Sequence, residues 1–308
     1  MKNTPILGAL FPNIQISPLQ ETILLEVRLP RIIAGILVGA ALSVSGVAYQ
    51  SMFRNPLADP YVLGVSAGAA AGGSIAIILH VGTALLGPYA ISLTAFVGAI
   101  LASFLVYEMG RVGGRTPVTT LLLAGIATSI FLSAFVTLAV VLSNPYTGEL
   151  HALIFWLFGS LAGSSWPYLW ASLPMILVGI LFLAILGRHL NLILLGEEAE
   201  QLGLEAEKIK KIIIVLASFV TSAAVAISGI IGFVGLMIPH ITRMLVGPDH
   251  RVLLPCAALV GAIYLVLFDT VARVIYAPGE LPVGVMTALA GGPFFLYLLR
   301  RKRGEYAL

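Results

Sequence analysis

The longest uncharged stretch of the sequence lies between Asp59 and Glu108 and contains no Asp, Glu, Lys or Arg. A helix that spans the bilayer core needs about 20 consecutive apolar residues, so this stretch can hold two such helices. The whole chain is similar in character, since 59% of its residues are hydrophobic and only 10% are charged. Soluble domains carry about 25% charged residues. The sequence therefore predicts an all-α, polytopic integral membrane protein.

Apolar runs of sufficient length predict about nine spans, which together form a single transmembrane domain over residues 1–308. The run 234–246 is too short to cross a core of about 30 Å and contains Pro239, so we interpret it as a half-length or re-entrant helix. A short amphipathic segment, 150–161, is expected at a membrane interface. The first 20 residues predict neither a span nor a signal peptide. The predicted spans are 32–53, 61–80, 88–108, 118–142, 168–187, 210–229, 234–246, 252–274 and 283–299.

Lys and Arg residues orient the predicted spans, because cytoplasmic loops are enriched in them. If the C-terminal segment 300–303 is cytoplasmic, all but four of the 17 basic residues fall on the cytoplasmic side. The exceptions include three arginines at the outer ends of spans. In one interpretation, Arg273 pairs with Asp269 one turn away and the others anchor lipid headgroups. In the other, they form an electrostatic dock for an acidic protein outside. The four exceptions are Lys2, Arg28, Arg31 and Arg273.

The segment 64–68, Gly-Val-Ser-Ala-Gly, matches the nucleophile elbow of serine hydrolases. An elbow requires a strand-to-helix turn at its serine and a histidine within reach. Here the glycines continue four residues apart into a transmembrane pattern, which is typical of closely packed helices. We therefore interpret the segment as a packing surface. An intramembrane serine protease, with Ser66 as nucleophile and His240 as base, is an alternative.

Several expected features of other membrane proteins are missing from the sequence. It has no G-x-x-x-x-G-K-[ST] motif, so no nucleotide site is expected in this chain. Its five histidines are scattered without the spacing of metal ligands, so no metal site is expected either. Asp269 is the one acid well inside a predicted span, which disfavours a proton-driven secondary transporter, the second alternative. Nothing in the charge pattern indicates nucleic acid binding.

Six segments, in order, closely resemble the permease subunits of binding-protein-dependent ABC importers for vitamin B12, iron siderophores and haem, the FecCD family. The resemblance covers nearly the whole chain from residue 26. It implies the helical bundle of a type II ABC importer permease. Members of the family usually carry an additional span before RLPR, which gives ten, so one span is expected to be missing here. The segments begin RLPRIIAGILVGA (28–69), LLLAGIA (121–127), GEEAEQLGL (196–204), GFVGLMIPH (232–255), DTVAR (269–273) and ELPVGVMTA (280–299).

The resemblance also implies a function and partners. The chain would be a transport subunit and not an enzyme, and would move a metal-chelate substrate inward by ATP-driven alternating access. It would work as a homodimer in the inner or plasma membrane of a prokaryotic cell, surrounded by lipid. Two cytoplasmic ATP-binding cassette ATPase subunits would bind ATP and Mg, and this chain would bind no cofactor. A soluble substrate-binding protein would deliver the substrate from outside.

Individual residues acquire expected roles from the same resemblance. A structural turn between two spans is formed by Asn55, Pro56, Asp59 and Pro60, since proline ends one helix and begins the next. Val118 and Thr119 match the inner gate of the family. Arg28, Arg31 and Arg273 match positions that dock glutamates of the binding protein. Coupling to the ATPase is assigned to the loop at about 196–211, through Glu197, Glu198, Leu202, Gly203 and Leu204.

Overall fold

The computed structural model describes residues 17–80, 86–87, 89–143, 146, 148–196, 203 and 205–301. Within these residues the regular elements are helices, and the β-structure is one isolated bridge between Val112 and Arg115. In chain order the helices are α2 (Pro18–Thr22), η1 (Ile23–Arg28), α3 (Leu29–Met52), η2 (Pro60–Leu63), α4 (Val65–Leu79), α6 (Tyr89–Gly110), α7 (Val118–Leu142), α8 (Glu149–Leu157), α9 (Trp166–Ile185), α10 (Gly187–Ile193), α12 (Ala206–Ser228), α13 (Val234–Val246), α14 (His250–Ile275) and α15 (Val283–Arg301).

The helices agree with the nine predicted spans. Among the described residues, six helices are long and apolar enough to cross a membrane, and three shorter apolar helices, α4, α13 and α15, accompany them. The predicted half-length helix is α13, which has the predicted bounds Val234–Val246. The amphipathic segment predicted at an interface forms α8. The fold class predicted from the sequence is therefore confirmed.

The first span differs from its prediction at the N-terminal end. It was expected to begin at 32, but α2, η1 and α3 form one continuous helix of 35 residues over Pro18–Met52. Ser17 begins this helix with a capping box, in which its hydroxyl accepts from the Gln20 N–H and the Gln20 side chain accepts from the Ser17 N–H. Residues 1–16, where an additional family span would connect, lie outside the described residues.

Helix α3 is the centre of the bundle and is mostly buried, against α9, α12, α13 and α14. Glycines allow the closest of these contacts. A Cβ atom added at Gly39 would overlap the carbonyl oxygen of Gly261 in α14. One added at Gly46 would overlap the carbonyl oxygen of Gly235 in α13. The backbones therefore touch, which is how membrane helices gain dispersion energy without a hydrophobic driving force between them.

The second group of helices, α4, α6 and α7, is joined in the same way. Gly68 of α4 faces Gly98 of α6 so closely that a Cβ on either would overlap the other's carbonyl oxygen. Ser66 lies in the first turn of α4, and the short helix η2, not a strand, precedes it. The segment 64–68 therefore packs as predicted. The hydrolase elbow, and with it the serine protease alternative, is not supported.

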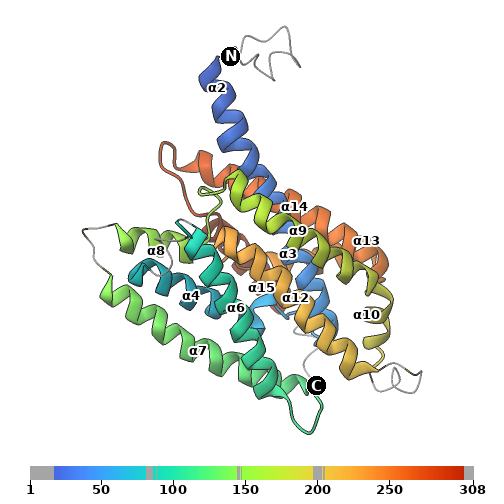
Figure 1. Cartoon of the computed structure of the whole chain (residues 1–308). Coiled ribbons are helices and arrows are strands. Elements are labelled where there is room, and N and C mark those ends of the chain that lie inside the picture. The colour runs from blue at the N-terminus through green and yellow to red at the C-terminus, as the bar shows by residue number, and fades with distance from the viewer. Residues whose placement is uncertain are drawn as a thin grey trace.

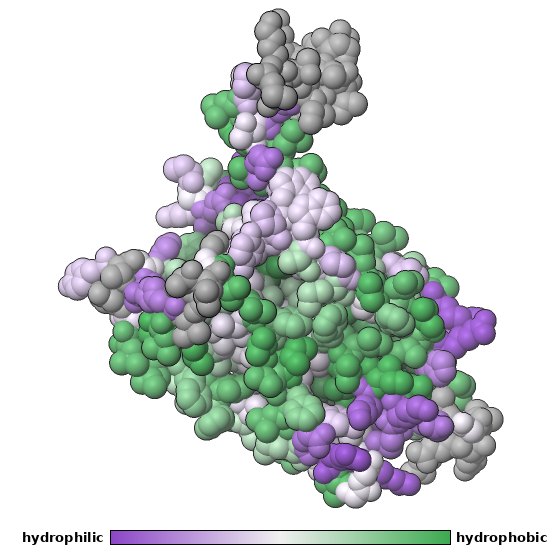
Figure 2. Space-filling model, viewed as in Figure 1, coloured by the Kyte–Doolittle hydropathy of each residue, from purple (hydrophilic) through white to green (hydrophobic). Residues whose placement is uncertain are grey.

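The bundle has two polar ends separated by an apolar belt. Figure 1 shows the N-terminal helix, α8 and the α14–α15 connection at one end, and α10 and the α6–α7 turn at the other. Figure 2 shows green apolar residues across the middle of the visible face and purple hydrophilic residues toward the ends. Large apolar side chains such as Leu101, Leu123, Leu181 and Leu259 are more than half exposed. Such a surface suits lipid and defines a multi-pass membrane protein.

The contact between α3 and α14 can be tested with one methyl group. Gly39→Ala should lower the midpoint of thermal unfolding in detergent, because the Cβ meets the Gly261 carbonyl, and overpacking of this kind costs about 1–3 kcal/mol. The matched control is Gly292→Ala in α15, where an added Cβ meets no described atom within 4 Å. Alanine is the better helix former, so this control should unfold at the same or a higher temperature. Equal behaviour of the two variants would contradict the close contact.

Candidate functional site

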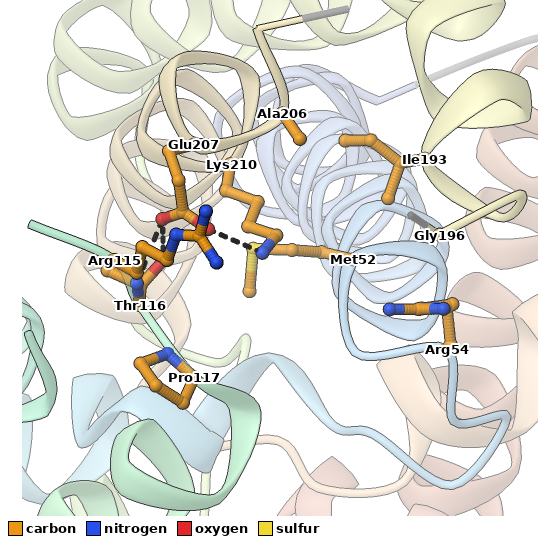
Figure 3. A pocket seen from close by; sticks show the side chains of 10 residues that line it. All are labelled: Met52, Arg54, Arg115, Thr116, Pro117, Ile193, Gly196, Ala206, Glu207 and Lys210. Carbon is orange, nitrogen blue, oxygen red and sulfur yellow. Dashed lines mark hydrogen bonds and ion pairs between the residues drawn. The ribbon is translucent and has the colours of Figure 1, made fainter. Parts of the chain in front are cut away.

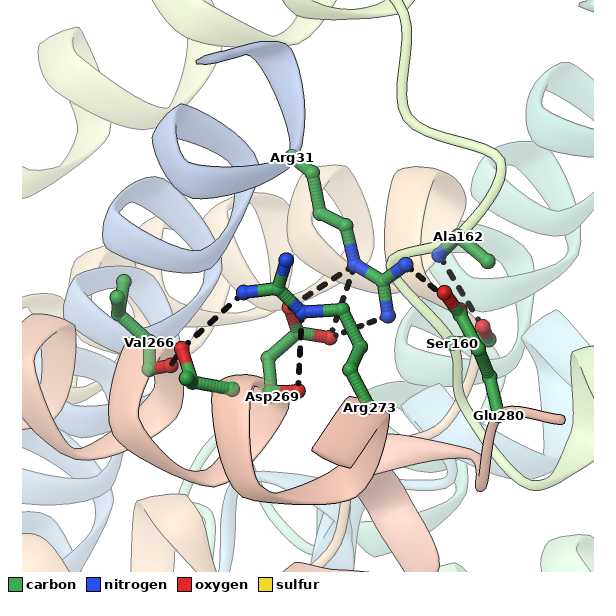
Figure 4. A network of polar contacts seen from close by, with 8 residues as sticks. Arg31, Ser160, Ala162, Val266, Asp269, Arg273 and Glu280 are labelled. Carbon is green, nitrogen blue, oxygen red and sulfur yellow. Dashed lines mark hydrogen bonds and ion pairs between the residues drawn. The ribbon is translucent and has the colours of Figure 1, made fainter. Parts of the chain in front are cut away.

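The outer end of the bundle holds a cluster of four charged residues, of which Arg31 and Asp269 are buried (Figure 4). Arg31 lies in the first turn of α3, Asp269 and Arg273 lie one turn apart near the end of α14, and Glu280 lies between α14 and α15. The Arg31 Nε and Nη2 atoms donate to the Asp269 carboxylate at 2.9 and 2.8 Å. Its Nη1 donates to Glu280 Oε2 at 2.7 Å, and Arg273 Nε lies 3.3 Å from Asp269 Oδ2.

The burial of Arg31 and Asp269 makes their ion pair important for stability. The side chains of Arg31 and Asp269 are only 6% and 5% exposed, so each charge would be costly without the other. The fork of the guanidinium meets both carboxylate oxygens, which is the geometry in which arginine binds carboxylates most strongly. Two cations and two anions make the cluster neutral as a whole. It therefore ties α3, α14 and the α14–α15 connection together at the outer end.

The three arginines predicted to dock a binding protein differ in their surroundings. Arg31 is buried, and its guanidinium is already bonded to two carboxylates. Arg273 is paired with Asp269, as the first interpretation of its position predicted. Arg28 ends η1, is half-buried, and forms no ion pair with a described residue. Docking stays a prediction for all three, and Arg28 is the one that can offer its charge without breaking an existing pair.

The inner end contains a cavity of about 690 Å³ with basic walls (Figure 3). Its one acid among the lining residues, Glu207 of α12, is already fully engaged. Glu207 Oε2 accepts from the Thr116 N–H at 2.8 Å and from the Thr116 hydroxyl at 2.7 Å. Its Oε1 lies 2.7 Å from Lys210 Nζ. The cavity is lined by Met52, Arg54, Arg115, Thr116, Pro117, Ile193, Gly196, Ala206, Glu207 and Lys210.

The predicted gate residues lie directly beside this cavity. Val118 and Thr119 are the first two residues of α7. The turn before them is a tight hairpin, in which Val112 and Arg115 exchange backbone hydrogen bonds at 2.9 and 3.1 Å. Gly113 and Gly114 supply the two positive φ angles, +57° and +83°, that such a turn requires. The predicted gate residues therefore follow directly after a hydrogen-bonded connection between α6 and α7.

Most of the predicted coupling residues cannot be placed. Glu197, Glu198, Leu202 and Leu204 lie outside the described residues. Gly203 is exposed and has φ +83°, a left-handed conformation that favours glycine, in line with the expected bend. The helices on either side of the loop, α10 and α12, both contribute residues to the basic cavity.

A second polar network anchors α10 at the inner end. The His250 Nδ1–H donates to the Asn191 side-chain oxygen at 2.6 Å, and His250 Nε2 contacts the Ser51 hydroxyl. The Asn191 amide donates to Asp249 at 2.8 Å. The pKa of Asp249 lies below its usual range because Arg251 and Asn191 donate hydrogen bonds to its carboxylate. These contacts join α10 to the ends of α3 and α14.

The predicted structural turn has the local geometry of a helix end followed by a helix start. The Asn55 side chain accepts from the Leu57 N–H at 2.9 Å, which closes the turn after α3. The Asp59 side chain accepts from the Tyr61 N–H at 2.8 Å and so caps η2, whose first residue is Pro60. Pro56 lies between these two contacts.

Close helix packing, an apolar belt and polar networks at both ends define a multi-pass helical membrane protein. The model of the FecCD transport family matches residues 2–301. The chain therefore belongs to the FecCD transport family, as the resemblance predicted.

Individual relatives agree with this assignment. The chain is 47% identical to the cobalamin import system permease protein BtuC of Halobacterium salinarum, with 91% of this chain and 74% of the relative covered. It is 42% identical to the hemin transport system permease protein HmuU of Yersinia pestis, over 91% of this chain and 84% of the relative. A solved inward-facing structure described as a metal-chelate type ABC transporter is 38% identical and superimposes with a TM-score of 0.83, covering 94% of this chain and 91% of the other.

Three contacts of the candidate sites join residues that are far apart in the sequence: Arg31–Asp269, Arg31–Glu280 and Thr116–Glu207. Arg31 was identified from its orientation, but its partners Asp269 and Glu280 are 238 and 249 residues away, and no spacing rule connects them. Glu207 was included in the loop at 196–211, but Thr116 gave no signal. The turn formed by NPLADP could be predicted, in contrast, because turn and capping preferences depend on neighbouring residues.

The buried pair at the outer end predicts a stability effect. Asp269→Asn removes the charge that Arg31 and Arg273 share, and breaking a buried pair in this way should cost about 3 kcal/mol or more. Glu205→Gln is the control, since Glu205 and its partner Lys208 are 72% and 67% exposed and exposed pairs contribute little to stability. Thermal unfolding in detergent should separate the two variants, and similar midpoints would contradict the assigned importance of the cluster.

Proposed function

We propose that this chain is the permease subunit of an ATP-driven importer that takes up a metal-chelate substrate, such as cobalamin, a ferric siderophore or haem. The observation that carries the proposal is the match to the FecCD transport family over residues 2–301, together with relatives that are permeases of cobalamin and hemin import. The chain itself performs no covalent chemistry. Two ATPase subunits on the cytoplasmic side would supply the energy, and a soluble protein outside would deliver the substrate.

The surface of α7 supports a homodimer that encloses the path. Among the six helices long enough to span a membrane, α7 is the least buried in the single chain. Thr119, Ser133 and Thr137 are exposed on it, and they fall on one face because their spacings are close to whole numbers of turns. In this stripe of hydroxyls, Ser133 and Thr137 donate to backbone carbonyls one turn earlier, and each oxygen can still accept a hydrogen bond from water in a path. A second copy facing this stripe would place it inside the assembly.

The inner end supports an ATPase partner on that side. The basic cavity brings together Arg54, Arg115 and Lys210, and the loop expected to contact the ATPase connects two helices that line it. A second function, a secondary transporter, has less support. Among the described membrane helices the buried acid Asp269 is neutralised by two arginines, so it is poorly placed to carry protons.

Transport in a defined system tests this proposal. The chain, purified with its ATPase subunits, is reconstituted into liposomes, and uptake of cobalamin, ferric hydroxamate and haemin is measured with the cognate binding protein. Uptake of one of these should require ATP, the ATPase and the binding protein together. Uptake by the chain alone, or uptake that continues without ATP, would contradict the proposal.

Docking at the outer end has a separate test in Arg28. Arg28→Glu should slow the association of the binding protein by about threefold to tenfold at low salt, because opposite charges steer the encounter. The difference should shrink as salt rises, since the Debye length falls from about 10 Å at 0.1 M to about 3 Å at 1 M. Arg188→Glu, the same charge change on α10 at the inner end, is the control and should leave the association rate unchanged. Surface plasmon resonance gives both rates, and equal rates would exclude Arg28 from docking.

A further inference from the structure

The one direct polar contact recorded between the α6–α7 hairpin and α12 is the pair Thr116–Glu207. Two donors of Thr116, its N–H and its hydroxyl, converge on the same oxygen of Glu207 at 2.8 and 2.7 Å. The carboxylate is charged, so both bonds are stronger than those between neutral groups. Thr116 is buried, with 3% of its surface exposed. Thr116 is therefore shielded from solvent, and its two hydrogen bonds fix its position relative to Glu207.

Local sequence explains why Thr116 is free to make this contact. It precedes Pro117, and a residue before proline is pushed away from helical geometry into an extended conformation. Its N–H is thus outside the hydrogen-bond ladders of α6 and α7 and needs another acceptor. Glu207 supplies that acceptor from the first turn of α12. Lys210, one turn later in α12, holds the other carboxylate oxygen at 2.7 Å.

On the Thr116 side, hydrogen bonds stiffen the segment from the end of α6 to the first turn of α7. The hairpin through Gly113 and Gly114 is closed by two backbone hydrogen bonds. The hydroxyl of Thr120 donates to the carbonyl of Gly110 at 2.6 Å, which clamps the first turn of α7 to the end of α6. A displacement of Thr116 therefore moves the end of α6, the hairpin and the first turn of α7, where Val118 and Thr119 lie, as one piece.

The Glu207 side of the contact leads to the loop that precedes α12. Helix α12 packs mainly on α3, α9 and α6, whereas α7 packs on α4 and α6. The first turn of α12 and the first turn of α7 are thus joined by a side-chain contact instead of by extensive helix packing. A push on the start of α12 reaches the gate most directly through the Glu207 carboxylate.

We propose that Glu207 is a positioning residue that transmits movement of the first turn of α12 to the predicted gate residues Val118 and Thr119 through its bonds to Thr116. The proposal rests on the proposed function, because it requires an ATPase that displaces the start of α12. It adds a specific carboxylate that carries the movement. In this arrangement Lys210 orients the carboxylate, and Thr116 receives the displacement.

The chain contains its own control for this proposal. Glu205 and Lys208 form a second pair at the same helix start and with the same spacing, with 3.2 Å between Lys208 Nζ and Glu205 Oε2. Their side chains are 72% and 67% exposed, whereas those of Glu207 and Lys210 are 29% and 21% exposed. Glu205→Gln therefore removes an equivalent charge from the same turn without touching the hairpin.

A labelling experiment measures gate movement without knowledge of the substrate. The full chain, with Cys256→Ala and Thr119→Cys, is reconstituted with its ATPase subunits, and a membrane-impermeant maleimide is applied from the cytoplasmic side with and without ATP. The parent complex should show an ATP-dependent change in labelling rate at the gate. In Glu207→Gln this change should shrink at least about fivefold, which is the lower end of typical coupling factors. ATP hydrolysis should stay within about twofold of the parent, because coupling between sites is lost and not the partner's chemistry.

Thr116 variants separate a transmitting role from a merely structural one. Thr116→Ser keeps the hydroxyl and should respond to ATP like the parent complex. Thr116→Val loses it and should respond weakly, and adding Glu207→Gln to Thr116→Val should lower the response little further, since both changes remove one interaction. Thermal unfolding of each variant shows that it is folded.

The outcomes distinguish this proposal from the one on which it rests. Wild-type-like gate labelling in Glu207→Gln, or equal losses in Glu207→Gln and Glu205→Gln, would overturn the role of Glu207 and leave the importer function intact. A parent complex that hydrolyses ATP without any change in labelling would overturn the ATP-driven function itself, and the role of Glu207 with it.

Discussion

Contact between the backbones of neighbouring helices is the constraint on which this fold depends. Lipid is as apolar as leucine, so membrane helices associate through packing and polar contacts instead of the hydrophobic effect. Gly39 and Gly46 lie seven residues apart, about two turns, and so face nearly the same side of α3. They place α14 and α13 directly against it. Helix α13, with 13 residues, is too short to cross the bilayer alone, and this contact holds it inside the bundle.

Buried charges then determine how the outer ends of these helices are arranged. Glycine contacts bring α3 and α14 together but leave their ends free to splay. The Arg31–Asp269 pair closes that end, and Glu280 extends the tie to the connection before α15. The pair also explains why Arg31 is basic at a position where the orientation rule disfavours it. A membrane-embedded charge needs a partner, and here the partner stabilises the meeting point of two helices.

How much the sequence could reveal depended on whether the signal was local. Span lengths, the short α13 and the turn at Asn55–Pro60 follow from hydrophobicity, proline and capping preferences, and all were predicted. The early start of the first helix at Pro18 was not predicted, because the prolines and polar residues of the first 20 residues interrupt the apolar pattern, whereas Ser17 and Pro18 in fact begin a helix. Glu205 and Glu207 look alike in EAEKIKK, since each has a lysine three residues later. Only the fold shows which one meets Thr116, because that contact joins residues 91 apart.

The polar contacts at the inner end connect α10 and α12, the helices before and after the loop at 196–205, to different parts of the bundle. Before the loop, α10 is bonded through Asn191 and His250 to the end of α3 and the start of α14. After the loop, the first turn of α12 is bonded through Glu207 to the hairpin that precedes the predicted gate residues. Both helices are therefore tied to other elements by polar contacts, but to different ones. Of the two, only α12 is linked by a side-chain contact to the α6–α7 hairpin, so a displacement of its first turn is the one that this contact can pass on.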